Sequence, residues 1–286
     1  MSGLIIRPAS RKEFAVAVGW AASEGWNPGL DDLAAFHAAD SQGFLMGFME
    51  GEPVSSISVV RYGENFGFLG FYIVRPDMRG TGAGIETWNA GMAHLAGRTV
   101  GLDGVVAQQD NYRKSGFALA GRNIRHTGLR PAVAGPDTGL TVRPVGHSDL
   151  AALADYDRAH FHADRSGFLR DWVLPDDGIR RRSLLAVEDD AVAGYATIRE
   201  CRSGYKIGPL FADTPGVAET LFNALLATVP EGAEISLDTP EDNGPAVAMA
   251  VRAGLKPVFE TARMYRGPAP ALPLNRIYGI TTFELG

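Results

Sequence analysis

The sequence predicts an α/β (α+β) protein of two similar domains in tandem, each a mixed, mostly antiparallel sheet flanked by helices. Two observations lead to this prediction. The stretch Pro131-Ala-Val-Ala-Gly-Pro-Asp-Thr-Gly-Leu140 combines proline and glycine without hydrophobic periodicity, which is typical of a linker. Short segments of similar sequence also recur in the same order on its two sides. We therefore expect one domain at residues 1–130, a linker at 131–140 and a second domain at 141–286.

The repeated segments are weak individually but keep their order. Leu4-Ile-Ile-Arg-Pro8 opens the first half, and Leu140-Thr-Val-Arg-Pro144 opens the second. Three further pairs follow: Phe68–Val74 with Tyr205–Phe211, Gly101–Asp103 with Ser236–Asp238, and Ser115–Phe117 with Ala253–Leu255. Matches in one order indicate the duplication of one fold.

The strands that come first in the first half are expected to pair antiparallel. A strand at Leu4–Arg7 precedes helical stretches at Lys12–Ala22 and Leu30–Ala39. Two strands, Phe44–Met49 and Val54–Arg61, are then separated by Glu50-Gly-Glu-Pro53, a sequence typical of a hairpin turn.

The rest of the first half alternates between strand and helix. Phe66–Val74 is apolar on both faces, which indicates a central strand. In the helix expected at Ala83–Ala96, the spacing predicts a single buried face made by Ile85, Trp88, Met92 and Leu95. The expected order ends with a strand at Leu102–Ala107, a short helix at Asp110–Ser115 and a strand at Phe117–His126.

Composition excludes several classes of protein. Hydrophobic residues make up 45% of the chain, enough to build a core, which argues against disorder. The apolar run near the N-terminus, Leu4-Ile5-Ile6, is shorter than the roughly 7–15 residues of a secretory signal, and no run suits a membrane helix. Cys201 is the single cysteine, so we expect a cytoplasmic protein without a metal site. The net charge of −6 argues against a nucleic-acid partner.

Three alternating glycines lie between the central strand and the helix that follows it. The sequence there is Arg79-Gly80-Thr81-Gly82-Ala83-Gly84. Glycines let successive backbone N–H groups turn into one space, and the helix N-terminus adds unpaired N–H groups and its positive dipole end. With Arg79 at the rim, the segment would hold a pyrophosphate. It is neither a Rossmann fingerprint nor a P-loop. A glycine-rich turn without a ligand is the alternative.

This segment resembles the acetyl-CoA loop of the GCN5-related N-acetyltransferase (GNAT) family, with its pattern Arg/Gln-x-x-Gly-x-Gly/Ala. The sequence Tyr112-Arg-Lys-Ser-Gly116-Phe117 is similar to that family's segment near the acetyl-CoA sulfur. Together these features cover residues 66–126. The stretches Glu24–Gly29, Gly101–Gln108 and Ile280–Gly286 also resemble a two-domain subfamily with a divergent second domain.

The resemblance implies acetyl-CoA as cosubstrate and no metal. It implies that cofactor contacts come from the backbone of Ile73 and Val74 and from the loop residues Arg79, Gly80, Thr81, Gly82, Ala83 and Gly84. The family often has an asparagine seven residues before the tyrosine, and Val105 stands there instead. Asn111 could substitute by residue type, but it is adjacent to Tyr112 on a helix, so its side chain points elsewhere.

Acetyl transfer needs a deprotonated amine, a polarised carbonyl and a partner for the leaving thiolate. The resemblance implies that Tyr112 serves the thiolate, and packing is its alternative role. Glu24 and Asp103 are the candidate general bases, and a structural turn or strand-end role is the alternative for Asp103. Trp26 and Asn27 lie in a stretch that the family uses for substrates, although Trp26 is as well explained by packing.

The second half is expected to have lost the cofactor. Where the glycines should repeat, it has Asp213-Thr-Pro215-Gly-Val-Ala-Glu219, whose proline lacks an N–H and whose carboxylates would repel a pyrophosphate. Thr214 and Pro215 still suit the cap and first turn of a helix. The whole negative excess of the chain lies in this half, which suits a cationic acceptor or simply a solvated surface.

The sequence therefore predicts an acetyl-CoA-dependent N-acetyltransferase that acetylates a small cationic amine by direct transfer in a ternary complex. Its second half is expected to shape the acceptor pocket or act as a scaffold. The alternative is a non-catalytic acyl-CoA sensor or scaffold that acts through a protein partner. The oligomeric state stays open, a dimer included.

Overall fold

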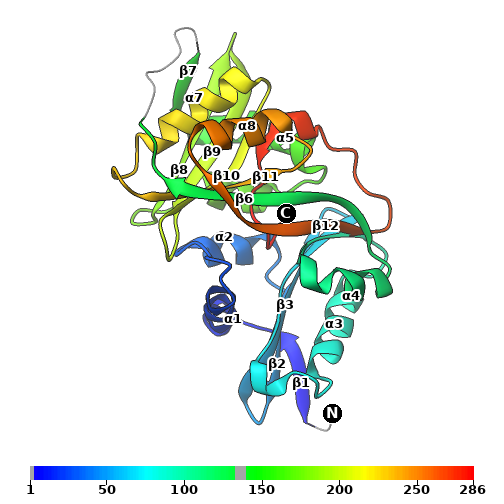
Figure 1. Ribbon diagram of the computed structural model, residues 1–286. Helices are drawn as coiled ribbons and strands as arrows, with labels where there is room; N and C mark the ends of the chain where they lie inside the picture. Colours follow the sequence, from blue (N-terminus) through cyan, green and yellow to red (C-terminus); the bar gives the residue numbers. More distant parts are fainter. Residues whose placement is uncertain (1–2, 133–139) are drawn as a thin grey trace.

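The computed structural model describes residues 3–132 and 140–286 (Figure 1). The first half contains β1 (Leu4–Pro8), α1 (Arg11–Ser23), α2 (Asp32–Ala39), β2 (Phe44–Met49), β3 (Glu52–Tyr62), β4 (Phe66–Val74), α3 (Ala83–His94), β5 (Thr99–Val105), α4 (Gln109–Lys114) and β6 (Ala118–Leu129). The second contains β7 (Thr141–Pro144), α5 (Leu150–Phe161), α6 (Ser166–Val173), β8 (Arg181–Glu188), β9 (Ala191–Glu200), β10 (Tyr205–Ala212), α7 (Pro215–Leu226), β11 (Glu234–Pro240), α8 (Gly244–Arg252), β12 (Lys256–Arg266) and β13 (Ile277–Gly279). Most of the expected linker, residues 133–139, lies outside the described residues.

The order of elements confirms the predicted mixed α/β class. The predicted strands at Phe44–Met49 and Phe66–Val74 have the observed bounds, and the other predicted elements shift by a few residues at their ends. One prediction is wrong in part. Trp88 and Leu95 are buried as predicted and Met92 is half-buried, but Ile85 is 58% exposed. The buried face of α3 also includes Ala83, Thr87 and Gly91. Thr87 can be buried because its hydroxyl meets that of Ser55 at 2.6 Å and donates to the carbonyl of Ala83.

The two halves begin with the same local device, as expected of a repeat. Arg7 in β1 pairs with Glu13 at 2.7 Å, and Arg143 in β7 pairs with Asp149 at 2.6 Å. Each carboxylate also accepts a backbone N–H three residues earlier, from Ser10 in the first half and Gly146 in the second. These contacts lower the pKa of both carboxyls to about 2, with the arginine as the first cause.

The sheet joins the halves by exchanging strands between them. In the described residues it has 13 strands, twelve of them in the order β1-β2-β3-β4-β5-β12-β6-β11-β10-β9-β8-β7. Strand β12 of the second half lies against β5 of the first, and β6 of the first half lies against β11 of the second. Figure 1 shows β6 and β12 running side by side between the two lobes. Each half therefore completes its sheet with a strand from the other.

The hydrophobic core also crosses between the halves. Phe36 on α2 stacks on Trp172 on α6, with ring centroids 5.8 Å apart, and both side chains are almost fully buried. Phe14 and Phe71 of the first half belong to the same cluster of buried side chains. No helix in the described part of the chain is both long and apolar enough to cross a membrane.

Candidate active site

A cavity of about 390 Å³ opens where β4 and β5 separate. These parallel strands pair from Phe66–Thr99 to Leu69–Leu102, and the pairing ends there. The residues that follow, Gly70 to Val74 on one strand and Asp103 to Val105 on the other, line the cavity. Parallel strands that separate in this way leave backbone N–H groups of β4 without a strand partner on the cavity side.

A bulge in β4 marks the point of separation. The register of β3 against β4 shifts between Ser56 and Ser58, and Phe71 has a φ of +45°, which is unusual for a bulky residue. The hydroxyl of Ser56 donates to the carbonyl of Phe71 at 2.8 Å and holds that backbone in place. Strain maintained by surrounding contacts is common at functional sites.

The glycine loop follows directly after β4, as predicted. Ile73, Val74 and Arg79 line the cavity, and α3 begins at Ala83 with Gly82 as its N-cap. Gly80 and Gly82 have φ values of +79° and +99°, so this backbone needs glycine. Gly84 is constrained by packing, because a Cβ there would lie 3.0 Å from the Tyr72 hydroxyl and the Val74 side chain, which would have to shift by a few tenths of an ångström. The hydroxyl of Thr81 is bonded to the Met78 carbonyl, within the loop.

Tyr112 on α4 lies in the cavity wall and is largely buried. Its ring stacks on Trp88 with centroids 5.9 Å apart, and it packs so closely on β5 that a Cβ at Gly104 would come within 2.2 Å of it. Burial, with a smaller effect of Tyr72, raises the pKa of Tyr112 to about 12. The phenol is therefore a hydrogen-bond donor throughout the neutral range.

The two candidate bases both line the cavity, and both are bound to arginine. Glu24 accepts from Arg79 at 2.6 Å, and this pair is about half exposed. The Asp103 carboxylate is buried and binds the guanidinium of Arg263 on β12 through both oxygens, at 2.8 and 2.6 Å. It also accepts from Asn123 on β6 at 2.8 Å. The contacts of Asp103 thus fasten the exchanged strands to β5.

The two candidate substrate residues lie in different surroundings. Trp26 lines the cavity. Asn27 instead bonds the backbone of Ser203 in the second half, once as donor at 2.8 Å and once as acceptor at 3.0 Å. The buried ammonium of Lys206 donates to the Asn27 carbonyl at 2.9 Å, and burial lowers its pKa. The second half therefore fixes the backbone of this loop, and Asn27 acts as its anchor.

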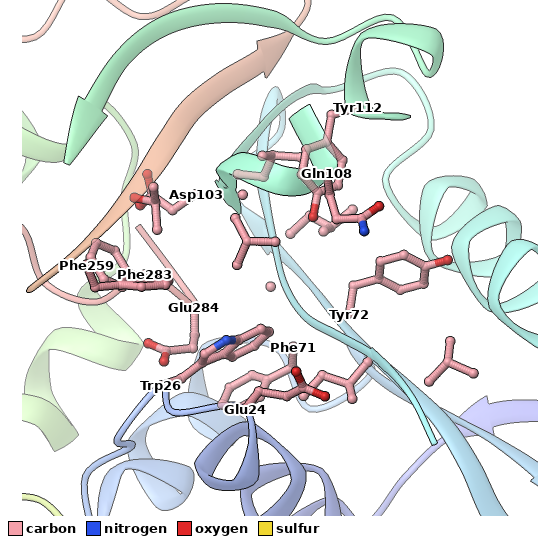
Figure 2. Close-up of a pocket in the computed structure, with 18 of the residues that line it drawn as sticks. Glu24, Trp26, Phe71, Tyr72, Asp103, Gln108, Tyr112, Phe259, Phe283 and Glu284 are labelled. Carbon is pink, nitrogen blue, oxygen red and sulfur yellow. The ribbon is translucent and has the colours of Figure 1, made fainter. Parts of the chain in front are cut away.

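Several cavity residues are absent from the predictions. Gln108 lines the cavity close to the expected pantetheine position, while Asn111 donates to it at 2.7 Å from an exposed site. Phe259 and Thr261 come from β12, and Phe283 and Glu284 come from the segment after β13. Figure 2 shows Phe259, Phe283 and Glu284 on one side of the cavity and Tyr72 on the other. The resemblance of Ile280–Gly286 to a subfamily was the one sequence signal near the last two.

In the second half, the corresponding gap is filled. Strands β10 and β11 pair from Tyr205–Ile235 to Ile207–Leu237, and β13 then lies against β10 at Leu210–Gly279. The N–H of Ile280 continues this segment onto β11 by donating to the Asp238 carbonyl. At the start of α7, Thr214 caps the helix and Pro215 follows it, as predicted. Asp213 there pairs with Arg276.

Both halves match acetyltransferase family models. Residues 11–117 match the acetyltransferase (GNAT) family, and residues 153–279 match an acetyltransferase (GNAT) domain. The holothin acyltransferase of Pseudoalteromonas sp. strain SANK 73390 is 33% identical over 281 residues, which cover 98% of this chain and 94% of that protein.

Solved structures share the fold across the whole chain. A putative acetyltransferase from Pyrococcus horikoshii superposes with a TM-score of 0.82 at 20% identity, covering 100% of this chain and 97% of that one. A tandem GNAT protein from the clavulanic acid biosynthesis pathway superposes with a TM-score of 0.65 at 16% identity, covering 93% and 100%. The fold is therefore that of tandem GNAT proteins.

Proposed function

This chain belongs to the GNAT family of acyltransferases, and we propose that it transfers an acetyl group from acetyl-CoA to the primary amine of a small cationic acceptor. Transfer is direct, with both substrates bound together. The observation that carries the proposal is the cavity between β4 and β5, which has the glycine loop at one end and Tyr112 in its wall.

We assign acetyl-CoA to the first half. The pyrophosphate would meet Arg79 and the N-terminal N–H groups of α3, and the pantetheine arm would follow the backbone of Ile73 and Val74. Gln108 would supply the side-chain contact to the pantetheine arm. In other members of the family this contact often comes from an asparagine at the position that Val105 occupies here. The second half is assigned a structural and pocket-forming role, because β13 fills the corresponding gap.

The cavity residues supply the chemistry of transfer. The amine nitrogen forms a bond to the thioester carbon, whose oxygen is polarised by backbone N–H groups of β4 beyond Phe71. The carbon–sulfur bond then breaks, and the proton lost by the amine passes to a carboxylate or to water. A CoA thiol resembles a cysteine thiol, with a pKa of about 8.5. Because the pKa of Tyr112 is about 12, its phenol favours a hydrogen bond to the thiolate over full proton transfer.

Between the two candidate bases, the contacts favour Glu24. Arg79 holds it through an exposed pair that a bound pyrophosphate would compete for, which would leave Glu24 free as the cofactor enters. Asp103 is held on both oxygens by a buried arginine. We therefore assign Asp103 to the joint between β5 and β12.

A calorimetric titration of acetyl-CoA tests the proposal. A carboxylate in Gly82→Asp would face the pyrophosphate, and the side chain would also strain a backbone whose φ is +99°. Both effects weaken binding, by about 2 kcal/mol or more, which is about 30-fold. Gly216→Asp is the control, because it places a carboxylate at the corresponding helix in the second half, where the nearest contact of a Cβ would be the Thr214 hydroxyl at 3.9 Å. We expect one site per chain, weakened by the first variant and unchanged by the second. Absence of binding by the folded wild type, or loss of binding in Gly216→Asp, would contradict the assignment.

The alternative is an acyl-CoA sensor that binds the cofactor without turning it over. Its supporting observation is the Glu24–Arg79 pair, which cofactor binding would rearrange at the surface. Thiol release separates the two functions. A sensor leaves acetyl-CoA intact with every amine and is indifferent to Tyr112→Phe.

A further inference from the structure

The segment after β13 passes between the two halves and reaches the catalytic cavity. Residues 280–286 are all buried. Two hydrogen bonds hold the backbone next to Glu284: the Tyr62 hydroxyl donates to the Leu285 carbonyl at 3.1 Å, and the Leu285 N–H donates to the Thr282 hydroxyl at 2.9 Å. The Glu284 backbone lies against Gly70, the first residue of β4 beyond its pairing with β5. Glu284 is therefore fixed next to the strand where the thioester is expected.

The Glu284 carboxylate is buried but makes no hydrogen bond to the described residues. Its residue is 4% exposed and lines the cavity, and it accepts no hydrogen bond from residues 3–132 or 140–286. Two buried guanidiniums interact with it electrostatically, but each already has a carboxylate partner. Arg125 binds Asp238 through two hydrogen bonds of 2.7 and 2.8 Å, and Arg199 binds Asp32 at 3.0 Å. Buried charged groups normally have a hydrogen-bonded partner, and among the described residues this carboxylate has none.

Glu284 differs in this respect from the other carboxylates of the cavity. Glu24 is bound by Arg79, and Asp103 is bound by Arg263. Of the described residues that line the cavity, Glu284 is thus the carboxylate without a hydrogen-bonded cation. Glu284 is therefore the cavity carboxylate left to bind an ammonium group, since Asp103 stays paired with Arg263 and Glu24 is assigned to the proton of the reacting amine.

The walls around this carboxylate are largely aromatic. Phe283 packs on Phe259 with centroids 5.9 Å apart, and Trp26 lines the cavity from the loop after α1 (Figure 2). Thr261 adds one polar group. It is 2% exposed, lines the cavity, and its hydroxyl has no hydrogen-bond partner among the described residues. Aromatic faces attract both flat apolar groups and cations.

We infer that Glu284, Thr261 and these three rings form the acceptor subsite, and that it takes a primary amine carried on a flat, apolar ring. This inference rests on the proposed function and names its acceptor class. Glu284 binds the ammonium group, the rings enclose the body of the molecule, and Thr261 bonds one polar substituent. A polyamine or an amino sugar fits poorly, because its further polar groups would face the three rings, while Asp103 stays paired with Arg263 and Glu24 serves the reacting amine.

Steady-state thiol release with acetyl-CoA and three probe amines tests the inference. The probes are phenethylamine, spermidine and glucosamine. We expect kcat/KM for phenethylamine to exceed both others by at least about tenfold. Glu284→Gln keeps the shape but removes the charge, and should raise the KM for phenethylamine about tenfold or more while the KM for acetyl-CoA stays within about twofold. Glu260→Gln is the control. It makes the same chemical change at an exposed glutamate of β12, which pairs with Arg122.

Each other outcome overturns the inference in a recognisable way. If spermidine or glucosamine is preferred, or if Glu284→Gln leaves the KM for phenethylamine unchanged, the acceptor subsite is wrong while the transferase function stands. If the wild type binds no acetyl-CoA, both fail. Should Glu284→Gln lose acetyl-CoA binding through misfolding, Thr261→Val decides instead. It should raise the acceptor KM for phenolic tyramine more than for phenethylamine, and equal effects would refute the assignment.

Discussion

Replacing Gly70 with alanine tests the packing that brings the two halves together at the cavity. A Cβ at this position would lie 2.2 Å from the Glu284 carbonyl oxygen and 2.8 Å from its Cα. Ordinary contact begins at 3.4 Å, so the segment must retreat by 3.4 − 2.2, or about 1.2 Å. The obstructing atoms belong to the backbone, and hydrogen bonds to Tyr62 and Thr282 restrain the next residue.

The size of the effect follows from that displacement. Adding a methyl to a well-packed core costs about 1–3 kcal/mol, and the upper part of this range applies because backbone must move. The melting temperature should then fall by about 4–6 °C. Since Phe283 and Glu284 move with the segment, a misplacement of about 1 Å should also lower kcat/KM for the acceptor by about 10–100-fold.

Differential scanning calorimetry, acetyl-CoA titration and acceptor kinetics together check this prediction. Gly216→Ala is the control, because its Cβ would be 3.9 Å from its nearest contact, the Thr214 hydroxyl, and a helical alanine stabilises by about 0.5–1 kcal/mol. Acetyl-CoA affinity should be unchanged in both variants. A Gly70→Ala protein with wild-type melting temperature and wild-type acceptor kinetics would refute the reasoning.

Three further predictions concern the cavity and its supports. Tyr112→Phe should lower kcat about 100-fold and leave the Kd for acetyl-CoA unchanged. Because burial raises the pKa of Tyr112 to about 12, ionisation of this phenol should not lower the wild-type rate below about pH 10. A fall in the wild-type rate just above neutral pH that is absent in Tyr112→Phe would contradict this. Glu24→Gln removes the carboxylate that pairs with the exposed Arg79, and it should strengthen acetyl-CoA binding by about 2–5-fold at low salt. Calorimetric titrations at increasing salt should show this gain in affinity disappear. Arg263→Ala leaves the buried Asp103 without its cation and should cost about 3–5 kcal/mol in urea unfolding, whereas a loss below about 1 kcal/mol would mean that the pair is solvated.

Local sequence was sufficient to predict the elements and the glycine loop before α3. The strand Phe66–Val74 could be predicted because an apolar run between turn residues is a local signal, which depends only on residues close in the sequence. Gly80 and Gly82 could be singled out because positive φ values require glycine whatever packs around them. The buried face of α3 was predicted less well. Its spacing includes Ile85, but the small residues Ala83 and Gly91 and the hydroxyl of Thr87 fit closer to the sheet.

The sequence by itself therefore predicted the two α/β halves, the repeated segments, and the glycine loop and tyrosine that line one cavity. Only the tertiary structure decided how the halves complete each other. The exchange of β6 and β12, the filling of the second gap by β13, and the approach of Glu284 to Gly70 all join residues far apart in the chain. Hydrophobic periodicity specifies which face of a strand is buried but not which strand lies beside it. The partner of each strand is decided by the packing of the whole core. The same packing places the Glu284 carboxylate in the cavity lining.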